Sequence, residues 1–344
     1  MSGDPILFWG AGAIGGTVGA FLREAGLPVL FVDKSAAHVK AINNQGLAIT
    51  GPIREFRVTA KAALPEELSG RFGLIFLCVK AQDTAAAADS LAPFLTEDGA
   101  VVSLQNGLNE QVIAARIGAE RTVGAFVNFG ADYMSPGVVH YGGRGAVVTG
   151  ELDGESRPRT RDVQRLLHIF DERAVLTANI WGFLWSKLAY GALLFATALT
   201  NDSIADCLAN PRYRPVLIAL TREVIDIALA NKITLEPFDG FDPKAFMAGK
   251  REAEASLDAL VAHNRKSAKT HSGIWRDLAV RKRKTEVRPQ LEPVVAAARS
   301  RGLMAPLTRR TIALIVEIED GARPLASENL DELAKLLPNA RAST

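Results

Sequence analysis

The chain has 344 residues, of which 48% are apolar and 23% charged, and its formal net charge is +2. This length predicts about two domains, and the near-neutral charge gives no reason to expect a nucleic-acid partner. The two cysteines exclude a disulfide framework and lack metal-ligand spacing, so no metal site is predicted. The sequence shows neither a secretion signal nor an apolar run long enough to cross a bilayer. We therefore expect a cytoplasmic protein without a membrane partner.

The chain begins with the pattern of a dinucleotide-binding unit. An apolar strand over Pro5–Trp9 leads into a glycine turn, a helix follows at once, and a second strand over Pro28–Val32 ends at Asp33. In such a unit the first glycine allows a tight turn, the second lets a pyrophosphate approach the backbone, and the third lets the helix pack on the strand. The helix N-terminus then offers N–H groups to the phosphates. The predicted cofactor-binding residues of the turn are Gly10, Ala11, Gly12, Ala13, Ile14 and Gly15.

Asp33 indicates which nicotinamide cofactor the unit prefers. It lies 21 residues after Gly12, where an acid accepts hydrogen bonds from a ribose 2′-OH and repels a 2′-phosphate. Lys34 follows immediately and partly offsets that charge. We expect both residues to lie at the cofactor, with NAD preferred over NADP.

The elements after Asp33 alternate as in a doubly wound parallel sheet. The apolar strands Leu74–Val79 and Ala100–Leu104 are followed by Lys80 and Asn106. Ligands of open parallel sheets bind at the carboxyl ends of strands, so both residues are predicted to be functional. The alternatives are a surface lysine that follows a strand and an asparagine that forms a turn with Gly107. The other predicted elements are a helix capped by Ser35 that exposes His38, short strands within Leu47–Thr59, a helix over Asp83–Leu91, a strand over Thr122–Asn128, and a hairpin that joins Val138–Tyr141 to Ala146–Thr149.

Strand patterns fade after Glu151, and helical periodicity replaces them. We predict an α/β fold with three parts: a Rossmann dinucleotide-binding domain over residues 1–175, an all-helical substrate and catalytic domain over 176–325, and a C-terminal helix with a loose tail over 326–344. The predicted helices are Arg157–Arg173, an apolar helix from Trp181 to about Leu199, Arg212–Asn231, Pro243–Leu260, Arg288–Arg301, Leu307–Ile318 and Glu328–Leu337.

Lys187, within the apolar helix, is the candidate for proton transfer. A lysine among apolar residues is costly unless it lines a binding site, and burial lowers its pKa towards the useful range. The alternative is a surface lysine with its ammonium in water. His271 and Ser272 lie in a polar stretch that precedes Glu286, where a helix-capping serine is the simplest interpretation.

Five motifs together make the chain resemble the ketopantoate reductase (2-dehydropantoate 2-reductase) family over about residues 5–320. They are GAGAIGG at 10–16, CVKA at 78–81, LQNGLNE at 104–110, WSKL at 185–188 and HSGIWRDLAVRKRKTEV at 271–287. The resemblance implies a Rossmann domain, a helical domain, and hydride transfer from a reduced nicotinamide to the keto carbon of a 2-keto acid. It also implies site residues: Lys187 as catalytic, Glu286 as a substrate-binding glutamate that can act with that lysine and is counted as catalytic here, and Lys80, Asn106 and Ser272 as binding the substrate, a small carboxylate. His271 is a departure from the family that adds a titratable group beside Ser272, and we expect it to contact the substrate as well.

Two positions depart from the family's pattern. Asparagines usually follow the catalytic lysine by four and eight residues, whereas this chain has Gly191 and Phe195. Two polar contacts are therefore lost, and we expect Gly191 to open space and Phe195 to fill it with apolar surface. We expect a 2-keto or 2-hydroxy acid other than ketopantoate. The alternatives are a true 2-dehydropantoate 2-reductase of pantothenate biosynthesis and a catalytically silent protein that senses NAD(P). A homodimer is one assembly that the family allows.

Overall fold

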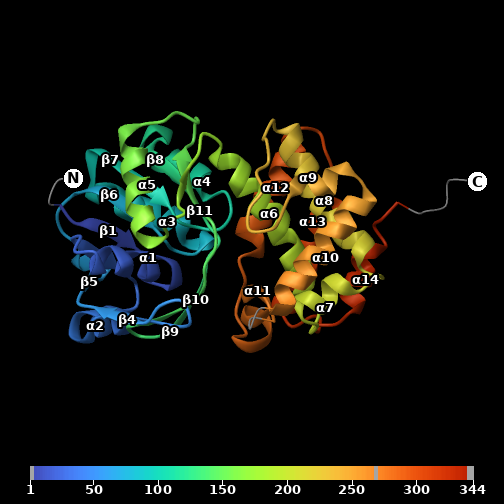
Figure 1. Ribbon diagram of the computed structural model, residues 1–344, viewed down its shortest axis with the longest axis horizontal. Coiled ribbons are helices and arrows are strands. Elements are labelled where there is room, and N and C mark those ends of the chain that lie inside the picture. Colours follow the sequence, from blue (N-terminus) through green and yellow to red (C-terminus); the bar gives the residue numbers. More distant parts are fainter. Residues whose placement is uncertain (1–3, 267–269, 339–344) are drawn as a thin grey trace, which may run out of the picture. The chain divides into compact units, whose positions relative to one another are not determined.

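The computed structural model describes residues 4–266 and 270–338 and divides into two compact units, Met1–Ile180 and Trp181–Thr344 (Figure 1). The first unit combines sheets and helices. The second, in the residues described, consists of helices and their connections. The predicted α/β fold with a helical second part is therefore confirmed. In the described ranges, no helix has the length and apolar character needed to cross a membrane.

An eight-stranded sheet forms the centre of the first unit. Its order is β12-β11-β8-β7-β6-β1-β2-β5, and the strands from β5 to β8 run parallel. The chain starts at β1, moves outward to β2 and β5, and then continues on the other side of β1 at β6, so the order reverses between β1 and β6. Open α/β sheets bind ligands at such a point. The strands are β1 (Ile6–Trp9), β2 (Val29–Val32), β5 (Lys61–Ala63), β6 (Phe72–Leu77), β7 (Leu95–Ser103), β8 (Thr122–Val127), β11 (Val147–Glu151) and β12 (Val175–Leu176).

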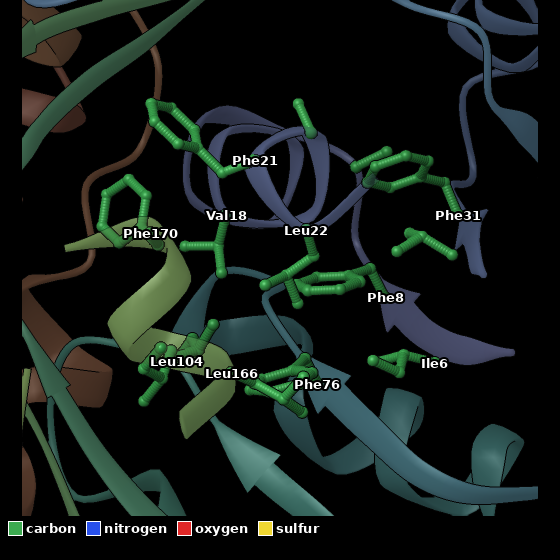
Figure 2. Close-up of a cluster of buried hydrophobic side chains, with 14 of the residues drawn as sticks. Ile6, Phe8, Val18, Phe21, Leu22, Phe31, Phe76, Leu104, Leu166 and Phe170 are labelled. Carbon is green, nitrogen blue, oxygen red and sulfur yellow. The ribbon is translucent and has the colours of Figure 1, made fainter. Parts of the chain in front are cut away.

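Helices cover both faces of this sheet because successive strand residues point to opposite sides. On one face, α1 (Ala13–Glu24) and α5 (Pro158–Phe170) pack over Phe8 and Phe76, whose rings stack with centroids 4.8 Å apart (Figure 2). On the other face, Leu7 lies in a separate apolar cluster with residues of α3 (Thr84–Leu91) and α4 (Asn109–Ile117). Both faces of β1 are thus buried, as its continuous apolar run predicts.

A second, four-stranded sheet lies in the same unit. Its order is β4-β3-β10-β9, built from β3 (Leu47–Thr50), β4 (Phe56–Val58), β9 (Gly130–Ser135) and β10 (Val138–Gly143). The predicted hairpin between Val138–Tyr141 and Ala146–Thr149 is wrong, because β10 pairs with β9 and β3 whereas β11 pairs with β8. The glycines between them form a crossover from one sheet to the other. Gly145 packs so closely on Asn128 that a Cβ there would lie 2.4 Å from its carbonyl oxygen.

The helices of the second unit follow the predicted pattern with three differences, one of which is the three-residue helix α11 that follows Ser272. The predicted helix over Pro243–Leu260 is divided at Gly249, and the short helix α7 was not predicted. The helices are α6 (Ile180–Thr197), α7 (Ile204–Ala209), α8 (Arg214–Ala230), α9 (Pro243–Ala248), α10 (Lys250–Lys266), α11 (Gly273–Trp275), α12 (Val287–Ser300), α13 (Pro306–Glu319) and α14 (Glu328–Ala334).

Candidate functional site

The glycine turn between β1 and α1 packs against the chain that leaves β6. Gly10 has φ +105°, and a Cβ there would lie 2.9 Å from the carbonyl carbon of Cys78. A Cβ on Gly15 would lie 2.1 Å from the Gly10 carbonyl oxygen. At Gly12, by contrast, a Cβ would meet no other described group within 4 Å. Two glycines therefore allow the packing and the third borders open space at the start of α1, which fits an approaching phosphate.

The carboxylate of Asp33 is fixed at the end of β2 by two backbone donors. The Ala11 N–H donates to Oδ2 at 3.0 Å, and the Ser35 N–H donates to Oδ1 at 2.9 Å. Each oxygen keeps a further lone pair, so the carboxylate can still accept bonds from ribose hydroxyls. Lys34 is exposed, and its ammonium lies 3.0 Å from the carboxylate of Asp83.

His38 occupies a different place from the one predicted. It is 1% exposed rather than on an open helical face, and it lies in α2 (Ala36–Gln45). Its Nε2 lies 2.8 Å from the Ala11 carbonyl oxygen, and its Nδ1 accepts the Gly137 N–H at 2.9 Å. The predicted exposure of His38 is wrong. Helical periodicity describes α2 alone and does not show that the backbone of Ala11 and Gly137 covers this side chain.

A buried polar network joins the segments that carry Lys80 and Asn106. The Gln105 amide donates to the Val79 carbonyl at 2.8 Å and to the Thr84 hydroxyl at 2.7 Å. Thr84 in turn donates to Asn109 at 3.0 Å, and the Asn109 amide donates to the Asn106 carbonyl at 2.6 Å. The network thereby fixes the residue before Lys80 and the backbone of Asn106.

The sequence reasoning did not identify these supporting residues. Gln105 and Asn109 lie in the LQNGLNE motif on either side of Asn106, so the polar side chains around this strand end could have indicated their supporting role. No sequence pattern indicated Thr84. Glu110 is fully buried beside them, and burial raises its pKa to about 8, so its carboxyl is protonated at neutral pH.

In the second unit, Lys187 lies on a half-buried stripe of α6. The stripe follows helical spacing, while most of the helix is fully buried. Burial lowers the pKa of Lys187 to about 8, and the carboxylates of Asp239 and Glu286 partly oppose that shift. The ammonium has thus lost much of its hydration, yet it remains largely protonated at pH 7. The stripe consists of Phe183, Lys187, Tyr190, Gly191 and Leu194.

The two departures from the family's pattern have different surroundings. Among the described residues, a Cβ on Gly191 would meet nothing within 4 Å, so the position after one turn from Lys187 is open. Phe195 was expected to add apolar surface to the site, but it is 1% exposed and lies in the core. Phe195 follows Lys187 by eight residues, which rotates it about 80° past the direction of Lys187. Leu194 follows Lys187 by seven residues, which leaves it only about 20° short of that direction, so Leu194 lies on the side of Lys187 instead.

Asp239 and Glu286 are held by local structure. Asp239 lies in a tight turn with φ +42°, closed by backbone bonds of 3.0 and 2.7 Å between Phe238 and Phe241. Glu286 precedes α12 and follows Thr285, whose N–H and hydroxyl donate to Glu319 at 2.7 and 2.6 Å. Sequence reasoning missed Asp239 and Glu319, since neither belongs to a recognisable motif.

Ser272 and His271 are tied to their own segment. Ser272 is 5% exposed, and its hydroxyl oxygen caps α11 by accepting the Trp275 N–H at 3.1 Å. This bond uses a lone pair and leaves the O–H able to donate. The His271 ring nitrogens lie 2.9 Å from the Thr270 hydroxyl and 3.2 Å from the Asn201 carbonyl oxygen. These contacts give His271 a structural place, and a role for either residue in binding substrate stays a prediction.

Comparison with known proteins gives a family match for each of the two units of the chain. The family model described as "Ketopantoate reductase PanE/ApbA" matches residues 6–154, and the model of its C-terminal part matches residues 179–319. The chain belongs to the ketopantoate reductase family. Membership identifies it as a nicotinamide-dependent oxidoreductase that acts on a CH–OH group.

Its relatives include two archaeal proteins named 2-dehydropantoate 2-reductase. One from Pyrococcus horikoshii is 30% identical and aligns over 67% of this chain and 75% of its own length. One from Halobacterium salinarum is 27% identical, over 91% and 98%. Two solved structures share the fold with TM-scores of 0.78 and cover 92% of this chain and 99% of their own. They are a ketopantoate reductase from Ralstonia eutropha, 23% identical, and D-mandelate dehydrogenase with NADH and anilino(oxo)acetate, 22% identical.

Two glycine substitutions distinguish a role in packing from a role in binding the cofactor. Gly15→Ala should lower the free energy of unfolding by about 3 kcal/mol, because its Cβ would overlap the backbone of the turn. Gly12→Ala should change that free energy by less than about 1 kcal/mol and yet weaken NADH binding roughly tenfold, because its Cβ enters the open space. Denaturant unfolding and fluorescence titration measure the two effects. Equal NADH affinity in Gly12→Ala and the unmodified protein would contradict this assignment.

Proposed function

We propose that this protein is an NAD-linked oxidoreductase that interconverts a 2-keto acid bearing an apolar side chain and the corresponding 2-hydroxy acid. The observation that carries the proposal is Lys187, a lysine with a lowered pKa on a half-buried, mainly apolar stripe and within the field of two carboxylates. A group of this kind is suited to proton transfer.

When bound, a reduced nicotinamide supplies the hydride that reaches the keto carbon. Negative charge then develops on the carbonyl oxygen, and Lys187 stabilises it and donates a proton to that oxygen. In the reverse direction the neutral amine of Lys187 takes the hydroxyl proton. The carboxylates of Asp239 and Glu286 favour the ammonium form, which keeps the acid available near neutral pH. We assign Ser272 to the substrate carboxylate, and Lys80 and Asn106 to cofactor and substrate.

The residues next to Lys187 on α6 suit an apolar substrate side chain. Gly191 leaves its position open, and Leu194 and the ring of Tyr190 border the same stripe. The Tyr190 ring packs against those of Phe238 and Phe241, with centroids 6.1 and 5.5 Å away. The hydroxyl of ketopantoate would gain no side-chain partner from Gly191 or Leu194. The anilino(oxo)acetate held by the D-mandelate dehydrogenase structure carries an aromatic group, which supports the same substrate class.

Three features support NAD as the preferred cofactor. Asp33 presents a fixed carboxylate at the end of β2, and a 2′-phosphate there would meet its negative charge. Lys34, which would have to neutralise that phosphate, is paired with Asp83. The D-mandelate dehydrogenase structure contains NADH. The nicotinamide cofactor itself follows from the family, whereas the preference for NAD belongs to this proposal.

A second function, reduction of ketopantoate, has support from the names of the relatives and from the retained motifs. It would require ketopantoate to be bound without the asparagine that the family usually has at the position of Gly191. A silent NAD(P)-sensing protein is less well supported, because Lys187 and its two carboxylates retain the arrangement that proton transfer needs.

The cofactor preference predicts a difference in affinity. NADH should bind at least roughly tenfold more tightly than NADPH, because repulsion of about 1.4 kcal/mol between Asp33 and the 2′-phosphate corresponds to that factor. Fluorescence titration of the free protein with each cofactor measures it. Tighter binding of NADPH would show that Asp33 does not set the preference.

Removal of the Lys187 ammonium should slow the reaction. Lys187→Ala should lower kcat by roughly 10²-fold or more, the scale for loss of a general acid. Reduction needs the ammonium and should decline as the pH rises through about 8, whereas oxidation needs the amine and should rise over the same range. In Glu286→Gln both limbs should move to lower pH, since a charge that raises the pKa of Lys187 is removed. Lys250→Ala, at an exposed lysine of α10, is the control, and an unchanged kcat in Lys187→Ala would exclude the proposed role.

Filling the open position should alter substrate choice. Gly191→Asn should lower kcat/KM for phenylglyoxylate roughly tenfold or more and for pyruvate much less, since the added amide occupies space that only the larger side chain needs. The matched control is Gly302→Asn, which also adds a side chain where nothing lies within 4 Å but at a left-handed position that asparagine tolerates. An equal loss for both acids would place the substrate side chain elsewhere.

A further inference from the structure

We propose that His38 is a positioning residue for the cofactor, because its neutral imidazole ties the glycine turn to the hairpin of the small sheet. The proposal relies on the cofactor role of the glycine turn that the proposed function includes. It gives a function to a buried histidine that belongs neither to the glycine motif nor to the groups proposed for proton transfer.

The hydrogen bonds of His38 define its protonation. Nδ1 lies 2.9 Å from the Gly137 nitrogen, and a backbone N–H can only donate, so Nδ1 carries no proton. The proton is therefore on Nε2, which donates to the Ala11 carbonyl oxygen at 2.8 Å. An imidazolium has no acceptor and would leave the Gly137 N–H without its partner. The site thus selects one neutral tautomer.

These bonds complete the support of Ala11, which lies between Gly10 and Gly12 in the glycine turn. Asp33 accepts its N–H at 3.0 Å and His38 donates to its C=O at 2.8 Å, so both polar groups of Ala11 are held by side chains. With Ala11 held on both sides, the peptide planes of the turn have little freedom. The direction of the backbone N–H groups at the start of α1 is then set before a phosphate arrives, which is preorganisation.

The other end of the contact lies in the small sheet. Gly137 forms the turn between β9 and β10 with φ +76°, and a Cβ there would lie 3.1 Å from the Ala41 Cβ, so the turn packs on α2. Tyr133 of β9 packs edge-on against the His38 ring with centroids 5.1 Å apart. Partial burial and the charge of Asp33 raise the pKa of Tyr133. Through His38, the hairpin of β9 and β10 is therefore connected to the glycine turn.

A core histidine without this role would affect stability alone. The two alternatives differ in one respect: a positioning residue changes the affinity for the cofactor in molecules that are still folded. The chain also provides a matched control, because His168 is exposed on α5 in the same unit. Glutamine is the conservative replacement, since its amide carries a donor and an acceptor on neighbouring atoms.

The test compares His38→Ala, His38→Gln and His168→Ala with the unmodified protein. Fluorescence titration gives the NADH dissociation constant, thermal unfolding shows that each variant is folded, and steady-state rates give kcat at saturating NADH. We expect His38→Ala to raise the dissociation constant roughly tenfold or more while kcat stays within about twofold, His38→Gln to recover most of the affinity, and His168→Ala to match the unmodified protein. An unchanged dissociation constant in folded His38→Ala would overturn the proposal.

A second measurement applies if His38→Ala does not fold. The ¹⁵N spectrum of the unmodified protein should show the His38 ring protonated on Nε2 and bare on Nδ1, and NADH binding should leave that tautomer unchanged. A ring protonated on Nδ1 would overturn the proposal. Failure of the proposed function is distinguishable, because it would appear as NADH binding without turnover of any 2-keto acid by the unmodified protein.

Discussion

The close packing of the glycine turn on the chain leaving β6 is the constraint on which the rest of the first unit depends. Gly10 and Gly15 leave no room for a Cβ between the turn and Cys78, so α1 lies directly over the sheet and its N-terminus meets the point where strand order reverses. Because the turn is held there, the side chain of Asp33 can reach the N–H of Ala11 and that of His38 can reach its C=O. A small error in this packing would move the start of α1 and the two side chains that bond to Ala11.

The second unit relies on a different principle, the cost of burying a charge. Lys187 lies on a mainly apolar stripe where its ammonium loses hydration, and the carboxylates of Asp239 and Glu286 return part of that stabilisation. Each carboxylate is placed by ordinary backbone structure, a tight turn in one case and a threonine bound to Glu319 in the other. The balance lowers the pKa of Lys187 to about 8, which suits the proposed role of this side chain as acid in reduction and base in oxidation.

Local patterns were enough to predict the glycine turn, the buried strands and a lysine with an unusual environment, because each depends on spacing along the chain. Contacts between distant segments were not readable. The partners of β10, the burial of His38 and the hydrogen bond from Gln105 to the carbonyl of Val79 all depend on how distant segments are placed. Helix geometry alone could have shown that Leu194, not Phe195, faces the side of Lys187.

The proposed substrate class depends on Gly191, one helical turn from Lys187, and the proposed cofactor preference depends on the carboxylate of Asp33, which is fixed at the glycine turn. The most direct measurement is the initial rate of reduced-cofactor oxidation with a panel of 2-keto acids, each assayed with NADH and with NADPH. The account predicts the highest kcat/KM for an acid with an apolar side chain and NADH. The highest value for ketopantoate with NADPH would contradict it.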